Sequence, residues 1–423
     1  MSASGTGPEA LLRALFAGAV AAADPARVLP PALPADTTAP ARVIGAGKAA
    51  AAMAAALHRA WRGPLAGSVV VPYGHAVPAG RVVVREAAHP LPDASALAAG
   101  DAMLADARAA SGSGERLICL FSGGASSIAC VPPPGIALGM KRGIVAALLD
   151  AGADIRRLNT VRRHLSLLKG GRLALAAAPS PILCLAISDV PGDEPALIGS
   201  GPCSPGTTTP SDARRILAEF GIPEPGPVRR WLDSPEAATP APGDPRLPPL
   251  DYRVIASPSS MLRAVCAEAL RRGLEVLDLG LDPGTAATEL AARHAAIARA
   301  RRAAGWSGLI VSGGESTARV RGGGRGGRNT EYLLALFEAL DAEPGISALA
   351  ADTDGIDGRA GAAGAVFGPA ERTRAAALGL HPLAHLGESD SAGFFATLGS
   401  LVVTGPTLTN VNDIRLIHLP PPG

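Results

Sequence analysis

Aromatic residues and net charge are scarce in this chain of 423 residues. Aromatic side chains make up only 3% of the sequence, which argues against the stacking platforms used to bind single-stranded nucleic acid. The 39 basic residues nearly balance the 37 acidic ones, leaving a formal net charge of +2. A dedicated nucleic-acid surface is therefore not expected either. These absences predict a small-molecule partner.

Paired cysteines and long apolar runs are also missing. The five cysteines have no spacing typical of a zinc site or a redox pair, so we interpret them as buried thiols in a reducing compartment. No uninterrupted apolar run is long enough to span a membrane. Residues 10–23 are apolar, but Arg13 interrupts them and no positive charge precedes them, which favours an amphipathic helix over a signal peptide. The sequence predicts a cytoplasmic protein without a membrane partner.

Lysine is the rarest cation, since only Lys48, Lys141 and Lys169 occur and arginine carries the remaining positive charge. A lysine retained in such a chain is informative. Its compact, strongly hydrated charge cannot be reproduced by arginine at every site.

The length predicts two to three domains, and apolar runs alternate with helical patterns as in an α/β fold. Residues 223–249 are rich in proline and lack periodicity, as a linker would be. We therefore predict an N-terminal domain over residues 1–245 and a C-terminal domain over residues 246–423.

An arginine- and glycine-rich segment, residues 311–329, is the most distinctive part of the chain. It reads VSGGESTARVRGGGRGGRN and has seven glycines and four arginines from Ser312 onward. An apolar run precedes it, and Asn329 or Thr330 can cap a helix that follows. A loop between a strand and a helix N-terminus, lined by arginine, favours an anion. The alternative is a disordered RGG-like loop.

Lys48 lies in a second such loop, Gly45-Ala46-Gly47-Lys48, between an apolar strand and an alanine-rich helical stretch. Ligands of open α/β sheets bind at this kind of turn. Gly45, Gly47 and Ala50 also fit the dinucleotide pattern G-x-G-x-x-G/A, although no acidic residue follows the next strand to bind a ribose. A purely structural turn is a further alternative.

The pattern S-G-G-x-S-[ST] follows a strand twice, at residues 122–127 and 312–317. Amides and hydroxyls in such loops suit phosphate oxygens. Lys169, which precedes two glycines, is a further candidate for an anion contact.

Carboxylates follow two other predicted strands. Asp189 and Asp193 come after the apolar run at residues 182–187, and Asp352, Asp354 and Asp357 come after residues 348–351. Such groups can hold Mg²⁺ or accept a hydroxyl proton. Aspartates that cap turns are the structural alternative. Cations, amides and carboxylates on several loops together favour transfer of a phosphoryl group.

These motifs, taken in order, resemble the glycerate 2-kinase family, whose C-terminal part is the MOFRL domain. The resemblance rests on GAGKAA, SGGASS, NTVRRHLS with KGGRLA, SDVPGDEP, GSGP, SGGEST with GGGRGGRN, ADTDGIDG and TGPTLTNVND. It implies an N-terminal Rossmann-like doubly wound sheet, a C-terminal α/β domain with a MOFRL region at about residues 305–417, and an active site in the cleft between the domains.

The implied reaction is transfer of the γ-phosphoryl of ATP, with Mg²⁺, to the 2-hydroxyl of D-glycerate. The resemblance makes Lys48 and Arg328 the leading catalytic residues, and Asp189 is our candidate for the base or a metal ligand. Tentative metal ligands are Asp189, Asp193, Asp352 and Asp354. The expected substrate and phosphate contacts are Gly47, Ser122, Gly123, Gly124, Ser126, Lys169, Ser312, Gly313, Gly314, Glu315, Arg325 and Asn329.

Two other functions stay open at this point. An NAD(P)H-dependent hydroxypyruvate reductase would use the turn at residues 45–50, and a non-catalytic sensor of a phosphorylated metabolite could use the same loops. The sequence leaves the oligomeric state open, with a homodimer as one option.

Overall fold

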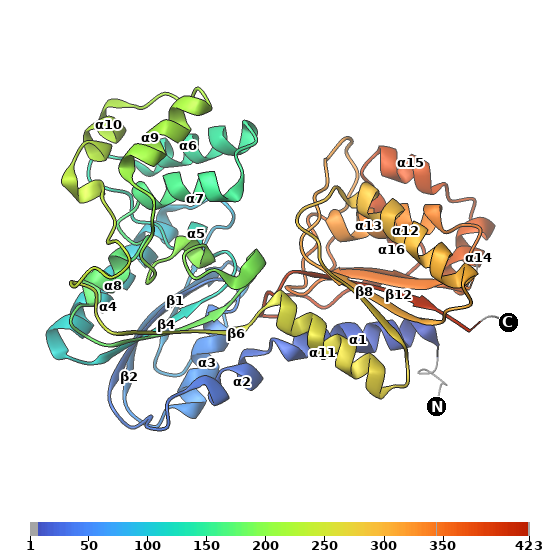
Figure 1. The fold of residues 1–423 in the computed structure, drawn as a ribbon, viewed down its shortest axis with the longest axis horizontal. Coiled ribbons are helices and arrows are strands. Elements are labelled where there is room, and N and C mark those ends of the chain that lie inside the picture. Colours follow the sequence, from blue (N-terminus) through green and yellow to red (C-terminus); the bar gives the residue numbers. More distant parts are fainter. Residues whose placement is uncertain (1–6, 344, 422–423) are drawn as a thin grey trace. The chain divides into compact units, whose positions relative to one another are not determined.

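The computed structural model describes residues 7–343 and 345–421 of the chain. Contacts divide the chain into two compact units (Figure 1). The central unit is Pro25–Ile255, and the terminal unit joins the residues up to Asp24 with those from Ala256 onward. A six-stranded sheet forms the middle of each unit, which confirms the predicted α/β class.

The sheet of the central unit has the strand order β3-β2-β1-β4-β5-β6, and β1 to β5 are parallel. This order is that of doubly wound nucleotide-binding folds, in which the chain changes direction between the first and fourth strands. The predicted Rossmann-like sheet is therefore confirmed. Its strands are β1 (Ala41–Ala46), β2 (Leu65–Pro72), β3 (Val83–Ala87), β4 (Arg116–Phe121), β5 (Ile182–Ile187) and β6 (Leu250–Ala256).

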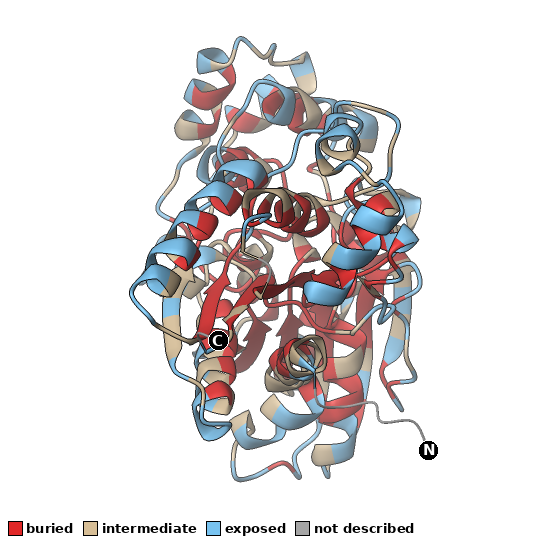
Figure 2. Ribbon diagram, turned by 90° about the vertical axis from the view of Figure 1, so that its right-hand side faces the viewer, coloured by how far each residue is buried: buried red, intermediate tan, exposed pale blue. Residues whose placement is uncertain are grey.

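Helices cover both faces of this sheet because its strands are apolar on both sides. Alternate strand residues such as Ile44, Cys119 and Cys184 form one core cluster with α4 (Ala94–Ser113) and α8 (Arg172–Ala177). The other face receives α3 (Ala50–Ala60), whose buried residues are not part of that cluster. Figure 2 shows the resulting contrast between buried strands and helices with exposed outer faces.

A helical layer with its own core lies beyond the carboxyl edge of this sheet (Figure 1). Asp154 caps one of its helices by accepting a hydrogen bond from the amide of Arg157, and Thr209 caps another. The layer consists of α6 (Leu138–Asp150), α7 (Ile155–His164), α9 (Pro210–Glu219) and α10 (Gly226–Leu232). Shorter helices of the unit are α2 (Pro25–Val28), α5 (Ala125–Ile128), η1 (Pro30–Ala32), η2 (Pro191–Asp193), η3 (Ile198–Ser200) and η4 (Pro235–Ala237).

The sheet of the terminal unit is mixed, with the order β11-β10-β9-β12-β8-β7. The last strand, β12, lies between β8 and β9 and is antiparallel to both, whereas β7 and β8 are parallel. Its strands are β7 (Val276–Leu281), β8 (Gly308–Gly313), β9 (Ser347–Asp352), β10 (Gly364–Phe367), β11 (Leu401–Val402) and β12 (Asp413–Leu419). Its helices are α1 (Pro8–Ala22), α11 (Pro258–Arg271), α12 (Ala287–Ala303), α13 (Arg328–Ala339), α14 (Pro369–Ala377), α15 (Pro382–Gly387) and α16 (Ser391–Thr397).

The division of the chain departs from the predicted domains at two places. Helix α1 buries Leu12, Leu15, Phe16 and Ala19, and it packs against α11 and β9 of the terminal unit. The proline-rich stretch is no boundary, because Val228 and Leu232 within it belong to the core of the helical layer. The chain leaves the central unit only after Ile255. Among the described helices, none is both long and apolar enough to cross a membrane.

Candidate active site

Lys48 lies at the carboxyl end of β1, in the turn that leads into α3. Its backbone amide donates a hydrogen bond to the carbonyl of Gly123 (2.9 Å), and the amide of Ala49 donates to Oγ of Ser122 (3.0 Å). These bonds join the ends of β1 and β4, the two strands between which the sheet changes direction. Ligands of doubly wound folds bind at this point. The structure therefore brings the predicted residues of both loops together.

Position 47 requires glycine because the loop at residues 122–124 lies against it. It has φ of 127°, and a Cβ atom there would lie 2.2 Å from Oγ of Ser122. The amide of Ala50 donates to the carbonyl of Gly47, so the amides of residues 48–50 are all engaged within the protein. A dinucleotide pyrophosphate binds to free amides at such a helix start. The turn at residues 45–50 is therefore better suited to presenting Lys48 to a ligand than to binding a dinucleotide.

Ser126 and Lys169, two further predicted contacts, meet in the central unit. Nζ of Lys169 donates to the carbonyls of Ser126 (2.9 Å) and Gly199 (3.5 Å). The side chain is only 2% exposed. Burial, and then the nearby cation of Lys141, lower the pKa of Lys169 to about 7. Lys169 is therefore a cation close to its titration point at neutral pH.

A pocket of about 380 Å³ adjoins this lysine, between α5 and the helical layer. We call it the central pocket. Four of its lining residues are cations, and none is a carboxylate. Besides Lys169, the cations are Lys141, Arg142 and Arg162, and the remaining walls are Pro90, Leu91, Pro92, Ser126, Ser127, Cys130 and Val145. Sequence reasoning noted that Lys141 was rare but assigned it no site.

Asp189 and Asp193 follow β5, as predicted from the apolar run. Both carboxylates are half-buried. Asp193 has φ of 54°, and its Oδ1 is buried without a hydrogen-bond partner among the described residues. A buried carboxylate oxygen without a partner is costly unless a cation or a proton satisfies it.

Arg328 is the first residue of α13 in the terminal unit. Its Nε lies 2.8 Å from Oδ2 of Asp413, and its Nη2 lies 2.7 Å from Oδ2 of Asp352 and 3.0 Å from Oε1 of Glu315. Burial opposes the charge, but these three carboxylates outweigh it and raise the pKa of Arg328 above its usual range. The charge of this arginine is thus already neutralised by the protein.

Arg415 is a buried cation beside the second S-G-G loop that sequence reasoning missed. It is 1% exposed, and its guanidinium donates to the carbonyls of Gly313 and Gly314 and to Oγ of Ser316. It therefore fixes the second S-G-G loop from β12. The signal in the sequence was the polar pair Asp413 and Arg415 in an otherwise apolar strand, but the strand beside it could not be identified from the sequence.

The N-terminus of α13 already holds an anion, the carboxylate of Asp357. It accepts hydrogen bonds from the amides of Asn329 (3.0 Å) and Thr330 (2.9 Å) and from the hydroxyl of Thr330. The predicted cap at Asn329 or Thr330 is therefore wrong, because Gly327 is the N-cap residue and Asp357 satisfies the free amides. The side chain of Asn329 is fully buried; its amide nitrogen donates to Asp413, and its Oδ1 has no hydrogen-bond partner among the described residues.

The carboxylates at the end of β9 do not form the cation cage that their number suggested. Asp352 accepts from Arg328 and from the amide of Asp354, Asp354 accepts from the amide of Ile356, and Asp357 caps α13. Across the described residues, no group of three or more His, Cys, Asp or Glu side chains is arranged to hold a metal ion. Mg²⁺ needs only one or two protein carboxylates when substrate phosphates complete its shell.

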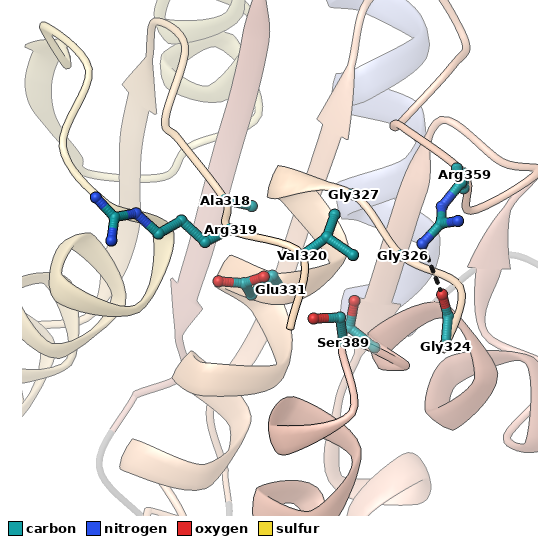
Figure 3. Close-up of a pocket in the computed structure, with 10 residues that line it drawn as sticks. Ala318, Arg319, Val320, Gly324, Gly326, Gly327, Glu331, Arg359 and Ser389 are labelled. Carbon is teal, nitrogen blue, oxygen red and sulfur yellow. Dashed lines mark hydrogen bonds between the residues drawn. The ribbon is translucent and has the colours of Figure 1, made fainter. Parts of the chain in front are cut away.

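A second pocket, of about 300 Å³, lies along the arginine-rich loop (Figure 3). Arg319 extends away from the pocket residues drawn around it, and Arg359 turns to the carbonyl of Gly324. Glu331 also lines the pocket, and burial raises its pKa above the ordinary value. Arg325, a predicted contact within this loop, is exposed. This pocket mixes both signs of charge.

Comparisons with known proteins extend over nearly the whole chain. Residues 11–233 match the family model described as a domain of unknown function, DUF4147, and residues 308–413 match the MOFRL family. A crystal structure of glycerate kinase from Thermotoga maritima is similar with a TM-score of 0.86 and 30% identity, covering 97% of this chain and 99% of that one.

Two curated relatives carry different names. The D-glycerate 2-kinase of Thermotoga maritima is 32% identical over 88% of this chain and 89% of its own length. A protein of Agrobacterium vitis, provisionally named a hydroxypyruvate reductase, is 45% identical over 96% of this chain and 93% of its own length.

Proposed function

The chain belongs to the glycerate 2-kinase family, and we propose that it transfers the γ-phosphoryl group of ATP to the 2-hydroxyl of D-glycerate, giving 2-phosphoglycerate and ADP. The observation that carries this proposal is the position of Lys48 at the switch point of the Rossmann-like sheet, beside the S-G-G loop of β4. A cation presented there can stabilise the charge that develops on a transferring phosphoryl group. Little covalent chemistry is then required of the protein.

Each proposed catalytic residue has a distinct role. Lys48 stabilises the transferring phosphoryl group, and Asp189 accepts the proton of the attacking hydroxyl or helps to hold the metal. Arg328 orients Glu315, Asp352 and Asp413 around itself. Because its guanidinium remains partly exposed, it can also donate to the glycerate carboxylate. Ser122, Gly123 and Gly124 line the same switch point as Lys48.

Mg²⁺ would be held by few protein ligands. The buried Oδ1 of Asp193, which has no partner among the described residues, fits a cation ligand, and Asp189 lies at the end of the same strand. Asp352 and Asp354 are less suitable because Asp352 accepts from Arg328 and from the amide of Asp354, and Oδ1 of Asp354 accepts from the amide of Ile356. When bound, the ion would neutralise charge on the phosphates. These residues would position it.

A hydroxypyruvate reductase is the second candidate, favoured by the name of one relative. Two features of the central unit weigh against it. The amides at the start of α3 are engaged within the protein, and β2 ends in Pro72-Tyr73-Gly74, a segment that carries no acidic residue of its own for a ribose hydroxyl. The kinase therefore remains the proposed activity.

Product identification tests the proposal. Purified protein is incubated with Mg-ATP and D-glycerate, and the product is passed to enolase, which accepts 2-phosphoglycerate and not the 3-isomer. A parallel reaction contains NADH or NADPH and hydroxypyruvate. We expect the enolase signal and no cofactor oxidation. Cofactor oxidation without phosphoglycerate would overturn the proposal and return the turn at residues 45–50 to a nicotinamide site.

A further inference from the structure

The cations of the central pocket lack the acidic partners that buried cations normally have. Lys141, Arg142, Arg162 and Lys169 line it, and none of them forms an ion pair among the described residues. Burial shifts the pKa values of Lys141, Arg162 and Lys169 most. The groups that also shift them are the Cys130 thiol and the cations themselves. Positive charge is therefore concentrated here without compensation from the protein.

Lys141 shows this most clearly. It lies on α6 and is 4% exposed, and its Nζ is buried without a hydrogen-bond partner in the described structure. Burial lowers the pKa of Lys141 most; the neighbouring Cys130 thiol, the next largest influence, opposes this, and the nearby cation of Arg162 lowers the pKa a little further. An unpartnered ammonium in such a place costs folding free energy. A protein that tolerates this cost gains by it only when a ligand supplies the missing partner.

We propose that the central pocket is a binding site for a phosphate-type oxyanion, held by Lys141, Arg162 and Lys169. Arg162 supplies a guanidinium fork, and the two lysines supply point charges from α6 and from beside α5. Arg142, on the exposed side of α6, adds attraction at the mouth. The remaining wall is partly apolar, with Leu91 and Val145, so an apolar part of a larger phosphorylated molecule would find surface to contact.

The inference goes beyond the proposed reaction because it concerns binding to the resting protein. An oxyanion could reach the pocket as part of a nucleotide, as a phosphate ester or as free phosphate. All three share the same chemistry, and competition separates them. The test needs no turnover, so a chain that binds phosphate but phosphorylates nothing would refute the kinase and leave this site standing.

The experiment is a calorimetric titration of the whole protein with inorganic phosphate at pH 6.5 and constant ionic strength. Removing one charged hydrogen-bond donor weakens binding by about tenfold or more, so we expect that loss for Lys141→Met. Arg142→Gln, at an exposed position, should lower affinity only about twofold to threefold, because an exposed charge contributes little. Arg263→Gln is the matched control, since Arg263 is an exposed arginine on α11 of the terminal unit.

Thermal unfolding separates a binding role from a structural one. If Lys141 serves a ligand, Lys141→Met should melt at an equal or higher temperature than the wild type without phosphate, because an unpartnered buried ammonium is replaced by an apolar chain. Phosphate should then raise the melting temperature of the wild type and not of the variant. A variant that melts lower, yet still binds phosphate as the wild type does, overturns the proposal.

Competition identifies the source of the oxyanion. Displacement of phosphate by ADP would assign the pocket to a nucleotide, and displacement by 2-phosphoglycerate alone would assign it to a phosphate ester. Either result supports the site when Lys141→Met also weakens the binding of that competitor. Absence of phosphate binding to the wild type, or binding that both pocket variants leave unchanged, contradicts it.

Discussion

The arginine-rich loop of the terminal unit and the central pocket both gather cations, but Arg328 of the loop is neutralised by carboxylates and, within the described structure, the pocket cations are not. Arg328 is surrounded by Glu315, Asp352 and Asp413. Lys141 and Lys169 have no carboxylate within ion-pairing distance among the described residues. A count of basic residues therefore does not locate an anion site. An anion site is indicated where cations outnumber the protein's own carboxylates around them.

The two regions also differ in whether the protein itself supplies the anion. The amides at the start of α13 are capped by Asp357, an anion that the protein itself supplies. Arg328 is therefore balanced within the protein, and the loop presents Glu315 and part of this arginine to the surroundings. The central pocket is an unbalanced charge that an external anion can satisfy.

Arg328→Ala is expected to have the largest effect. It removes Arg328 from the buried carboxylates of Asp352 and Asp413, of which Asp413 keeps Arg415 at 3.3 Å, and breaking a buried ion pair in this way costs about 3–5 kcal/mol of unfolding free energy. Denaturant unfolding measures it. Arg325→Ala is the control from the same loop, and it should change stability by no more than about 0.5 kcal/mol because Arg325 is exposed. Equal losses for both variants would contradict the distinction between the two arginines.

Lys48→Ala is expected to lower kcat by about a hundredfold to a thousandfold, the loss typical of removing one group that stabilises transition-state charge. Denaturant unfolding of the same variant distinguishes a loss of activity from a loss of folded protein. Steady-state kinetics with Mg-ATP and D-glycerate measure the effect. A raised KM with an unchanged kcat would instead place Lys48 in ground-state binding.

Asp357→Ala is expected to cost about 1–3 kcal/mol of unfolding free energy, because the amides of Asn329 and Thr330 lose their buried acceptor. The same variant should leave phosphate affinity in the central pocket unchanged. Unfolding and calorimetry on one preparation test both statements. A phosphate affinity that falls together with stability would show that the two regions are not independent.

The smallest predicted effect is a pH dependence of anion binding. The pKa of Lys169 is about 7, so the lysine is mostly charged at pH 6 and mostly neutral at pH 8. The affinity for sulfate, whose own charge is constant in this range, should fall by about tenfold between these values. The groups facing Lys169 are Lys141, Cys130 and Arg162.

Lys169→Met controls for those neighbouring groups. This variant should bind sulfate more weakly than the wild type at pH 6, and its affinity should change much less with pH. A wild-type affinity that stays constant or rises from pH 6 to pH 8 would exclude Lys169 as the titrating cation.

Strands and their loops could be predicted from the sequence because local patterns determine them. The apolar runs before Ser122 and Asp189 became β4 and β5, and the glycine turn at Lys48 joins β1 to α3. Partners distant in sequence could not be predicted. Asp413 lies 85 positions from Arg328, and nothing local to either residue indicates that β12 would lie between β8 and β9.

The candidate site was predicted less completely than the fold for the same reason. Residue type showed that Arg328 and Asp352 were important, but it could not show that they neutralise each other. Lys141 was noted only as one of three lysines and was assigned no site. Its burial without a partner among the described residues follows from the packing of α6 with α7 and of the residues that line the central pocket.

The most direct test of the contrast between the two regions is to locate a tetrahedral oxyanion in crystals of the free protein by the anomalous scattering of tungstate. The account predicts tungstate in the central pocket, within contact of Lys141 and Lys169, and its loss from that pocket in Lys141→Met crystals. Tungstate at the start of α13 or beside Arg328, with the central pocket empty, would contradict it.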